Sequence, residues 1–100
     1  MSISGTELRE AVAQDVTTSD EALIVDLADG RTITVPLAWF PRLAHATPAE
    51  RANCRLIGGG SGIHWPDVDE DISVESLLAG WRSRETQASL RRWLQARKGG

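Results

Sequence analysis

The chain has 100 residues, 41% of them hydrophobic and 25% charged, and a net charge of −3. This length accommodates one small domain with one core, and the composition excludes a wholly disordered chain. No stretch approaches the ~18 consecutive apolar residues of a membrane-spanning helix, and the first residues lack a basic flank followed by an apolar run, so we expect a cytoplasmic protein without a membrane partner.

Charge is distributed unevenly along the chain. Residues 81–100 contain six basic residues and one acidic residue, a local net charge of +5, which leaves −8 for residues 1–80. An acidic body with a basic tail can contact itself, a charged partner or nucleic acid, and charge alone does not choose among them. We predict a single small domain over residues 1–80 and a basic C-terminal helical extension over residues 81–100.

A β-hairpin is the clearest predicted element. Apolar residues alternate along two strands, at Leu23, Val25, Leu27, Ile33, Val35 and Leu37. A three-residue loop over 28–30 sets Val25 opposite Ile33, whereas a two-residue loop would set Leu27 opposite Thr32 and mix apolar with polar positions. We therefore predict the three-residue loop, with Gly30 in the left-handed conformation of a bulged turn.

Weaker signals flank this hairpin. A strand through about Val16 and a polar turn at residues 19–21 predict a three-stranded antiparallel meander. Beyond the hairpin, Trp39, Phe40 and Leu43 lie at near-helical spacing, but Pro41 limits them to a short turn. We expect this turn to cover one face of the sheet.

Two short helices and a further strand follow in the predicted order. Thr47 and Glu50 form a capping-box pattern around Pro48, which predicts a helix through about Ala52. Residues 54–57 predict a strand that ends in glycines. Ser73 or Asp71 is placed to cap a helix over residues 74–79, and the glycine at position 80 is placed to end it.

The tail predicts one more helix, from about Ser83 to Arg97. Leu90, Trp93 and Leu94 form a narrow apolar stripe, which is too narrow to stabilise an isolated helix of this length. We expect the stripe to dock on the chain's own domain or on a twin subunit, with Trp93 covering the meander. The whole pattern predicts an α+β fold: a small antiparallel sheet, made of the meander and a later strand, packs with short helices and precedes a C-terminal amphipathic helix.

Two sequence blocks carry a family resemblance. They read "DGR…VPLAWFPRL", within residues 29–43, and "GIHWPDVDEDISVESLL", over residues 62–78. Together they resemble the small, mainly bacterial family of unknown function DUF2442, over about residues 11–80. The resemblance implies a compact α+β domain and no known reaction. Genes of this kind often lie beside one for another small protein, as in a toxin–antitoxin pair, which implies a protein partner.

The acidic stretch after Pro66 could hold a metal or favour a helix. Asp67, Asp69 and Asp71 alternate, so an extended strand would place their carboxylates on one face. The calcium-loop pattern fails, because its glycine and glutamate positions, counted from Asp67, hold Ile72 and Leu78. We expect no metal and no cofactor, and we interpret the acids as favourable charges before the helix at 74–79.

His64 could serve as a general base with Asp67 or Asp69 in a small enzyme. No nucleophile accompanies it, since the sequence around Ser61 misses the spacing of a nucleophile elbow. We favour a partly buried His64 bonded through one ring nitrogen to a carbonyl or carboxylate, and Trp65 as a core anchor. Cys54, the only cysteine, is interpreted as a small apolar residue.

The leading functional hypothesis is a noncatalytic protein-interaction or regulatory module, one half of a toxin–antitoxin-like pair, whose partner is another protein or a second copy. The alternative is a nucleic-acid-binding regulator that uses the basic C-terminal helix. The enzyme with His64 and Asp67 or Asp69 is the third hypothesis. The candidate functional surface consists of His64, Trp65, Asp67, Asp69, Arg84, Arg91, Arg92 and Trp93.

Overall fold

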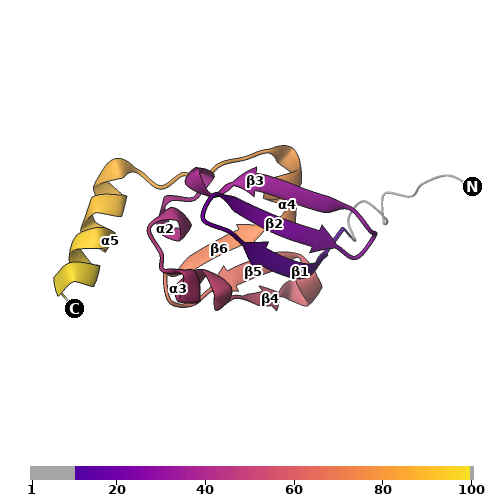
Figure 1. The fold of residues 1–100 in the computed structure, drawn as a ribbon. Coiled ribbons are helices and arrows are strands. Elements are labelled where there is room, and N and C mark those ends of the chain that lie inside the picture. The colour runs from indigo at the N-terminus through magenta and orange to yellow at the C-terminus, as the bar shows by residue number, and fades with distance from the viewer. Residues whose placement is uncertain (1–10, 100) are drawn as a thin grey trace, which may run out of the picture.

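Two three-stranded antiparallel sheets form the body of the protein in a computed structural model that describes residues 11–99 (Figure 1). The first sheet has the order β1-β2-β3 and the second β4-β5-β6. The strands are β1 (Ala13–Thr18), β2 (Ala22–Leu27), β3 (Thr32–Pro36), β4 (Arg55–Ile57), β5 (Gly62–Trp65) and β6 (Glu70–Ser73). The α+β prediction is confirmed.

Short helices connect the strands, and a longer helix follows them. They are the 3-10 turn η1 (Leu37–Trp39), α2 (Pro41–Ala44), α3 (Pro48–Ala52), the 3-10 turn η2 (Gly58–Gly60), α4 (Val74–Ala79) and α5 (Gln87–Gly99). Figure 1 shows α5 at one end of the body, beyond α2 and α3 and away from both sheets. Among the described residues, no helix is both long enough and apolar enough to cross a membrane.

The predicted hairpin register is confirmed. Val25 lies opposite Ile33, and Leu23 lies opposite Val35. The backbone N–H of Leu27 donates to the carbonyl of Arg31 at 2.7 Å, which closes the three-residue loop. Within it Gly30 has a φ of 99°, a conformation that strains residues with a Cβ.

The predicted helix caps also form. The Thr47 side chain accepts from the N–H of Glu50, and the Glu50 side chain accepts from the N–H of Thr47. The Ser73 side chain accepts from the N–H of Ser76 and caps α4, which ends at Gly80 in the left-handed conformation. Of the two residues proposed for the second cap, Ser73 is therefore the one that acts.

Two element predictions were wrong in detail. The meander is followed by three later strands rather than one, because residues 62–65 pair with β4 and residues 70–73 pair with residues 62–65. The last helix begins at Gln87 rather than at Ser83. The N–H of Ser83 donates to the carbonyl of Trp39 at 3.0 Å, which ties this segment to η1, and the Thr86 side chain accepts from the N–H of Ser89.

The inner faces of the two sheets share one core. Ile63 and Trp65 of β5 lie in the same buried cluster as Leu23 and Val25 of β2. The Trp65 indole N–H donates to the carbonyl of Arg51 at 3.0 Å, so its polar atom is satisfied within the core. The turn after β3 covers this core as expected, since Phe40 and Leu43 are buried there, and Trp39 is partly buried against it.

Candidate functional site

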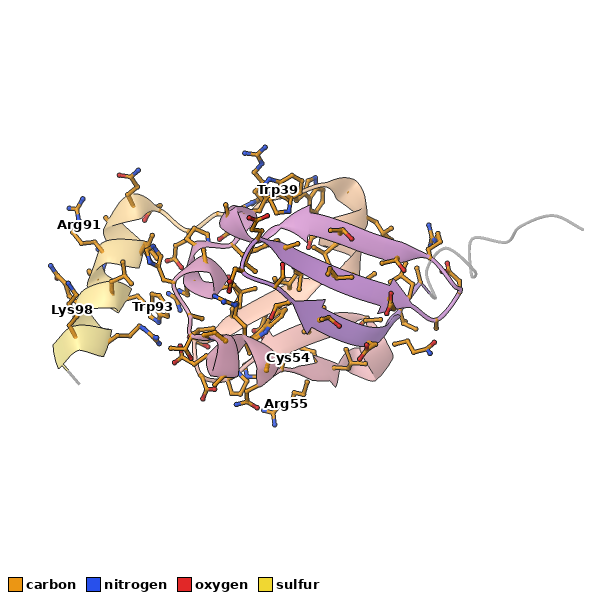
Figure 2. All side chains as sticks on the ribbon, viewed as in Figure 1. Trp39, Cys54, Arg55, Arg91, Trp93 and Lys98 are labelled. Carbon is orange, nitrogen blue, oxygen red and sulfur yellow. The ribbon has the colours of Figure 1, made fainter. Side chains whose placement is uncertain are left out.

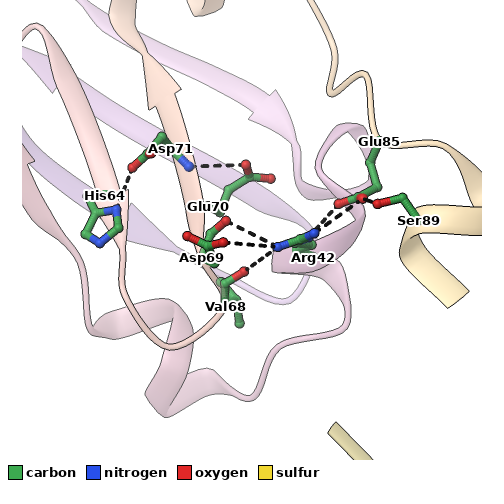
Figure 3. Close-up of polar contacts among 8 residues, drawn as sticks. All are labelled: Arg42, His64, Val68, Asp69, Glu70, Asp71, Glu85 and Ser89. Carbon is green, nitrogen blue, oxygen red and sulfur yellow. Dashed lines mark hydrogen bonds and ion pairs between the residues drawn. The ribbon is translucent and has the colours of Figure 1, made fainter. Parts of the chain in front are cut away.

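His64 and Asp71 pair on the outer face of the second sheet. The sheet register places them directly opposite each other, with Arg55 on the far side of His64. His64 Nδ1 lies 2.5 Å from Asp71 Oδ1, and the His64 side chain is 22% exposed (Figure 3). The expected bond to a carboxylate is thus present, and it fixes the orientation of the imidazole ring.

The other acids proposed as partners of His64 lie elsewhere. Asp67 and Asp69 belong to the turn over residues 66–69, which lies before β6, so the register cannot bring either carboxylate to His64. Asp67 instead accepts from the Asn53 side chain at 2.9 Å. Asp69 has a φ of 52°, and its carboxylate lies 3.9 Å from Arg42. The pairing of His64 with Asp67 or Asp69 was therefore wrong.

Two further expectations about this stretch need correction. Trp65 is fully buried and contributes nothing to a functional surface, although its interpretation as a core anchor agrees with its position. The three alternating aspartates do not share a strand face, because only Asp71 lies in a strand. Within residues 11–99, no three Asp, Glu, His or Cys side chains gather in an arrangement that could hold a metal ion.

A groove runs along β6. One wall is β6 itself, and the opposite wall is the extended segment 81–84, with Phe40 and Ser76 also lining the groove. Its volume is about 320 Å³. Trp81 lies in this lining and is 57% exposed, more than Leu56, Ile57 or Leu78, the other large exposed apolar side chains of the described chain. Burial in the same lining raises the pKa of the Glu70 carboxyl.

A second hollow adjoins the groove over the outer face of the second sheet. It shares residues 71–73 and Ser76 with the groove and extends to Ile57 and Gly62. Sequence reasoning missed Trp81. The available signal was an aromatic residue directly after the helix-ending Gly80, outside the apolar stripe of either neighbouring helix.

Arg42 of α2 connects the body to α5. Its Nε lies 2.5 Å from Glu85 Oε1, and its Nη1 donates to the carbonyls of Val68 and Asp69 at 3.3 and 3.4 Å (Figure 3). The Ser89 hydroxyl also donates to Glu85. The Arg42 and Glu85 side chains are only 18% and 10% exposed, so this ion pair is partly buried.

Trp93 lies against two arginines, Arg42 of α2 and Arg97 of its own helix. Its ring lies 5.2 Å from the Arg42 guanidinium and 4.6 Å from that of Arg97. Arg97 also bonds Glu50 of α3 at 2.8 Å. Figure 2 shows Trp93 pointing from α5 toward α2. The expectation that Trp93 covers the meander was wrong, because residues 81–86 carry the chain beyond the sheets before α5 begins.

The two carboxylates that hold α5 are stabilised in their charged forms. The hydrogen bond from Arg42 lowers the pKa of Glu85 below its usual value, and the hydrogen bond from Ser89 adds to this effect. The hydrogen bond from Arg97 lowers the pKa of Glu50 in the same way. A carboxyl with a lower pKa in the folded state adds stability above its unfolded pKa, and this stability is lost as pH falls through the folded pKa.

We therefore expect acid to release α5. As pH falls below the usual glutamate pKa of about 4.3, protonation of both carboxyls removes the negative charge from each contact, and the helix should leave the body. The measurement is the NMR chemical shift of the Trp93 indole N–H during a pH titration, with the buried Trp65 indole as the internal control. A Trp93 signal that changes only together with that of Trp65 would contradict this prediction.

Several basic side chains lie on the exposed surface of α5 and of the preceding segment. Arg84, Arg91, Arg92 and Lys98 are exposed, and none forms an ion pair with a carboxylate in the part of the chain that the structure describes. Figure 2 shows Arg91 and Lys98 on the side of α5 that faces away from the body. Arg82 differs, because its guanidinium stacks on Trp39 at 4.9 Å.

Two solved structures of other proteins are similar to this one. A crystal structure of a protein of unknown function from Rhodospirillum rubrum is 30% identical, with a TM-score of 0.65, over 81% of this chain and 98% of that one. A solution structure of an uncharacterised protein from Chromobacterium violaceum shares the fold, with 18% identity and a TM-score of 0.66 over 88% of this chain and 81% of that one. No curated protein matches. The family model for proteins of unknown function DUF2442 matches residues 13–83, a span that includes Trp81 and all the groove residues except Arg84, and the chain therefore belongs to the DUF2442 family.

Proposed function

We propose that the protein is a noncatalytic interaction module that binds a partner protein through the groove beside β6. The observation that carries this proposal is the exposure of Trp81 on that groove. An exposed tryptophan on a groove is suited to anchor a partner, because tryptophan is among the residues that contribute most to protein interfaces. The partner is a second small protein, as in a toxin–antitoxin-like pair.

The surroundings of His64 support a noncatalytic role. The carboxylate of Asp71 orients its ring, but in the described structure no serine, threonine or cysteine side chain forms a hydrogen bond with that ring. Acid–base catalysis needs a reacting group within reach of the base, and nucleophilic catalysis needs an activated nucleophile. The pair more simply joins β5 to β6 across the outer face of the sheet.

The test is capture of the partner from the native host with the tagged full chain, followed by size-exclusion chromatography of the purified pair. Trp81→Ala should weaken the complex by roughly 30-fold, the effect of losing a side chain that contributes about 2 kcal/mol. Leu78→Ala is the matched control, because Leu78 is also apolar and exposed but does not line the groove. A chain that always elutes as a lone monomer, or equal weakening by both changes, would overturn the proposal.

Nucleic-acid binding is the second candidate function, and the unpaired basic side chains of the tail favour it. Four phosphate contacts, from Arg84, Arg91, Arg92 and Lys98, would make log K fall with log salt concentration at a slope of about −3.6 for duplex DNA. The quadruple glutamine variant should lose this binding, whereas Arg82→Gln should retain it. Affinity that does not change with salt would exclude phosphate contact.

A further inference from the structure

We propose that the groove binds an extended segment of the partner as a fourth strand, added to the free edge of β6. This inference rests on the proposed function and specifies how that same groove works. Strand addition uses backbone hydrogen bonds for affinity and alternate side chains for specificity. It therefore requires unpaired backbone groups that point into the groove.

The pairing of β5 with β6 determines which backbone groups these are. The N–H of Val74 donates to the carbonyl of Ser61 at 2.9 Å, which makes this a hydrogen-bonded pair of the antiparallel ladder. Hydrogen-bonded and non-bonded pairs alternate, so Asp71 and Ser73, which lie opposite His64 and Gly62, occupy non-bonded positions. Their N–H and C=O groups consequently point away from β5, toward the groove.

Two of these four groups have partners within the chain. The N–H of Asp71 donates to Glu70 Oε1 at 3.2 Å. The carbonyl of Ser73 accepts from the Ser76 hydroxyl at 2.7 Å. For the carbonyl of Asp71 and the N–H of Ser73, residues 11–99 provide no hydrogen-bond partner. These two groups lie on either side of Ile72. One residue of an added strand, placed opposite Ile72, can therefore donate its N–H to the Asp71 carbonyl and accept from the Ser73 N–H with its own carbonyl.

The groups around the edge indicate the chemistry of the bound segment. A residue opposite Ile72 would point toward the inner side, where Phe40 lines the groove and an apolar side chain fits. Its neighbours along the segment would point to the outer side, beside Asp71, whose side chain is 65% exposed. Opposite charges directly across two strands are favourable, so a basic residue belongs there. Arg82 and Arg84 also line the groove and disfavour further basic residues. The ligand class is an extended peptide in which a single basic residue adjoins an apolar one.

The other edge of the same sheet provides a matched control. By the same alternation, the backbone groups of Leu56 point away from β5 at the free edge of β4. No residue of this strand lines the groove that contains Trp81. Strand addition at β6 should therefore slow amide exchange at Ser73 and leave exchange at Leu56 unchanged.

The experiment selects binders to the full chain from a phage-displayed library of random peptides and measures amide hydrogen exchange by NMR with a selected peptide at saturation. We expect one basic residue next to an apolar residue in the selected peptides, and at least tenfold slower exchange at the Ser73 amide. A peptide N-methylated at the alternate backbone amides that face β6 should bind at least tenfold more weakly, since it cannot donate to β6.

The outcomes separate this inference from the function on which it rests. A peptide that requires Trp81 for binding but leaves Ser73 exchange unchanged would overturn strand addition and keep the groove as a binding site. Failure to select any peptide that requires Trp81, together with failure to isolate a partner complex, would overturn both. Equal protection of Ser73 and Leu56 would indicate general stabilisation of the sheet and would also overturn strand addition.

Discussion

Replacing Trp65 with alanine is expected to lower the free energy of unfolding by about 3–5 kcal/mol, the range found when a large aromatic side chain is removed from a core. Trp65 is 0% exposed and belongs to the core that the two sheets share. The change leaves a cavity and also removes the indole donor from the carbonyl of Arg51. The total free energy of unfolding of a domain of this size is about 5–15 kcal/mol, so the alanine change should remove much of it.

Urea denaturation at equilibrium measures this effect, with two comparison variants. Trp65→Phe keeps most of the apolar volume and should cost less than the alanine change. Trp81→Ala removes the same side chain from an exposed position and should change stability by less than about 0.5 kcal/mol. If the alanine changes at positions 65 and 81 cost the same, the assignment of Trp65 as the core anchor fails.

Replacing Arg42 with methionine should give the second-largest loss, roughly 1.5–3 kcal/mol, as for a hydrogen bond to a charged partner. The change leaves the Glu85 carboxylate partly buried without its cation and leaves the carbonyls of Val68 and Asp69 without a donor. It also removes one of the two cations that lie against Trp93. Both the unfolding free energy and the docking of α5 should decrease.

A double-mutant cycle separates these contributions. Arg42→Met combined with Glu85→Gln removes the cation and the charge together, so the double variant should be more stable than the sum of the two single losses predicts. Denaturation of the four proteins gives the coupling energy, and the Trp93 indole resonance reports on docking. Additive losses would show that Arg42 acts independently of Glu85, through the carbonyls of Val68 and Asp69 and through Trp93.

The parts of the fold that the sequence predicted depend on short-range patterns. Alternation over residues 23–37 determined the hairpin loop, because a shift of one residue would have placed polar side chains in the core. The capping box at Thr47 and Glu50 identified the start of α3, since both hydrogen bonds lie within four residues of each other. Local chemistry of this kind needs no knowledge of distant partners.

The features that the sequence did not predict depend on contacts between residues that are distant in the chain. β5 and β6 have four residues each, too few for periodicity to distinguish a strand from a loop, and their pairing is what selects Asp71 as the partner of His64. Arg42 and Glu85 are 43 residues apart, so nothing near either residue identifies the pair. The groove likewise forms only when segment 81–84 folds back beside β6.

The contiguity of each sheet in the sequence has a consequence for folding kinetics. The first sheet is complete at Pro36, and the second needs only residues 55–73, so most loop closures are short and folding should be fast. During synthesis, however, Trp65 emerges 29 residues after Pro36, a delay of about 1.5–6 s at ~5–20 residues per second. For that interval the nascent meander lacks the second sheet that covers Leu23 and Val25, which exposes an apolar surface that can aggregate on the ribosome.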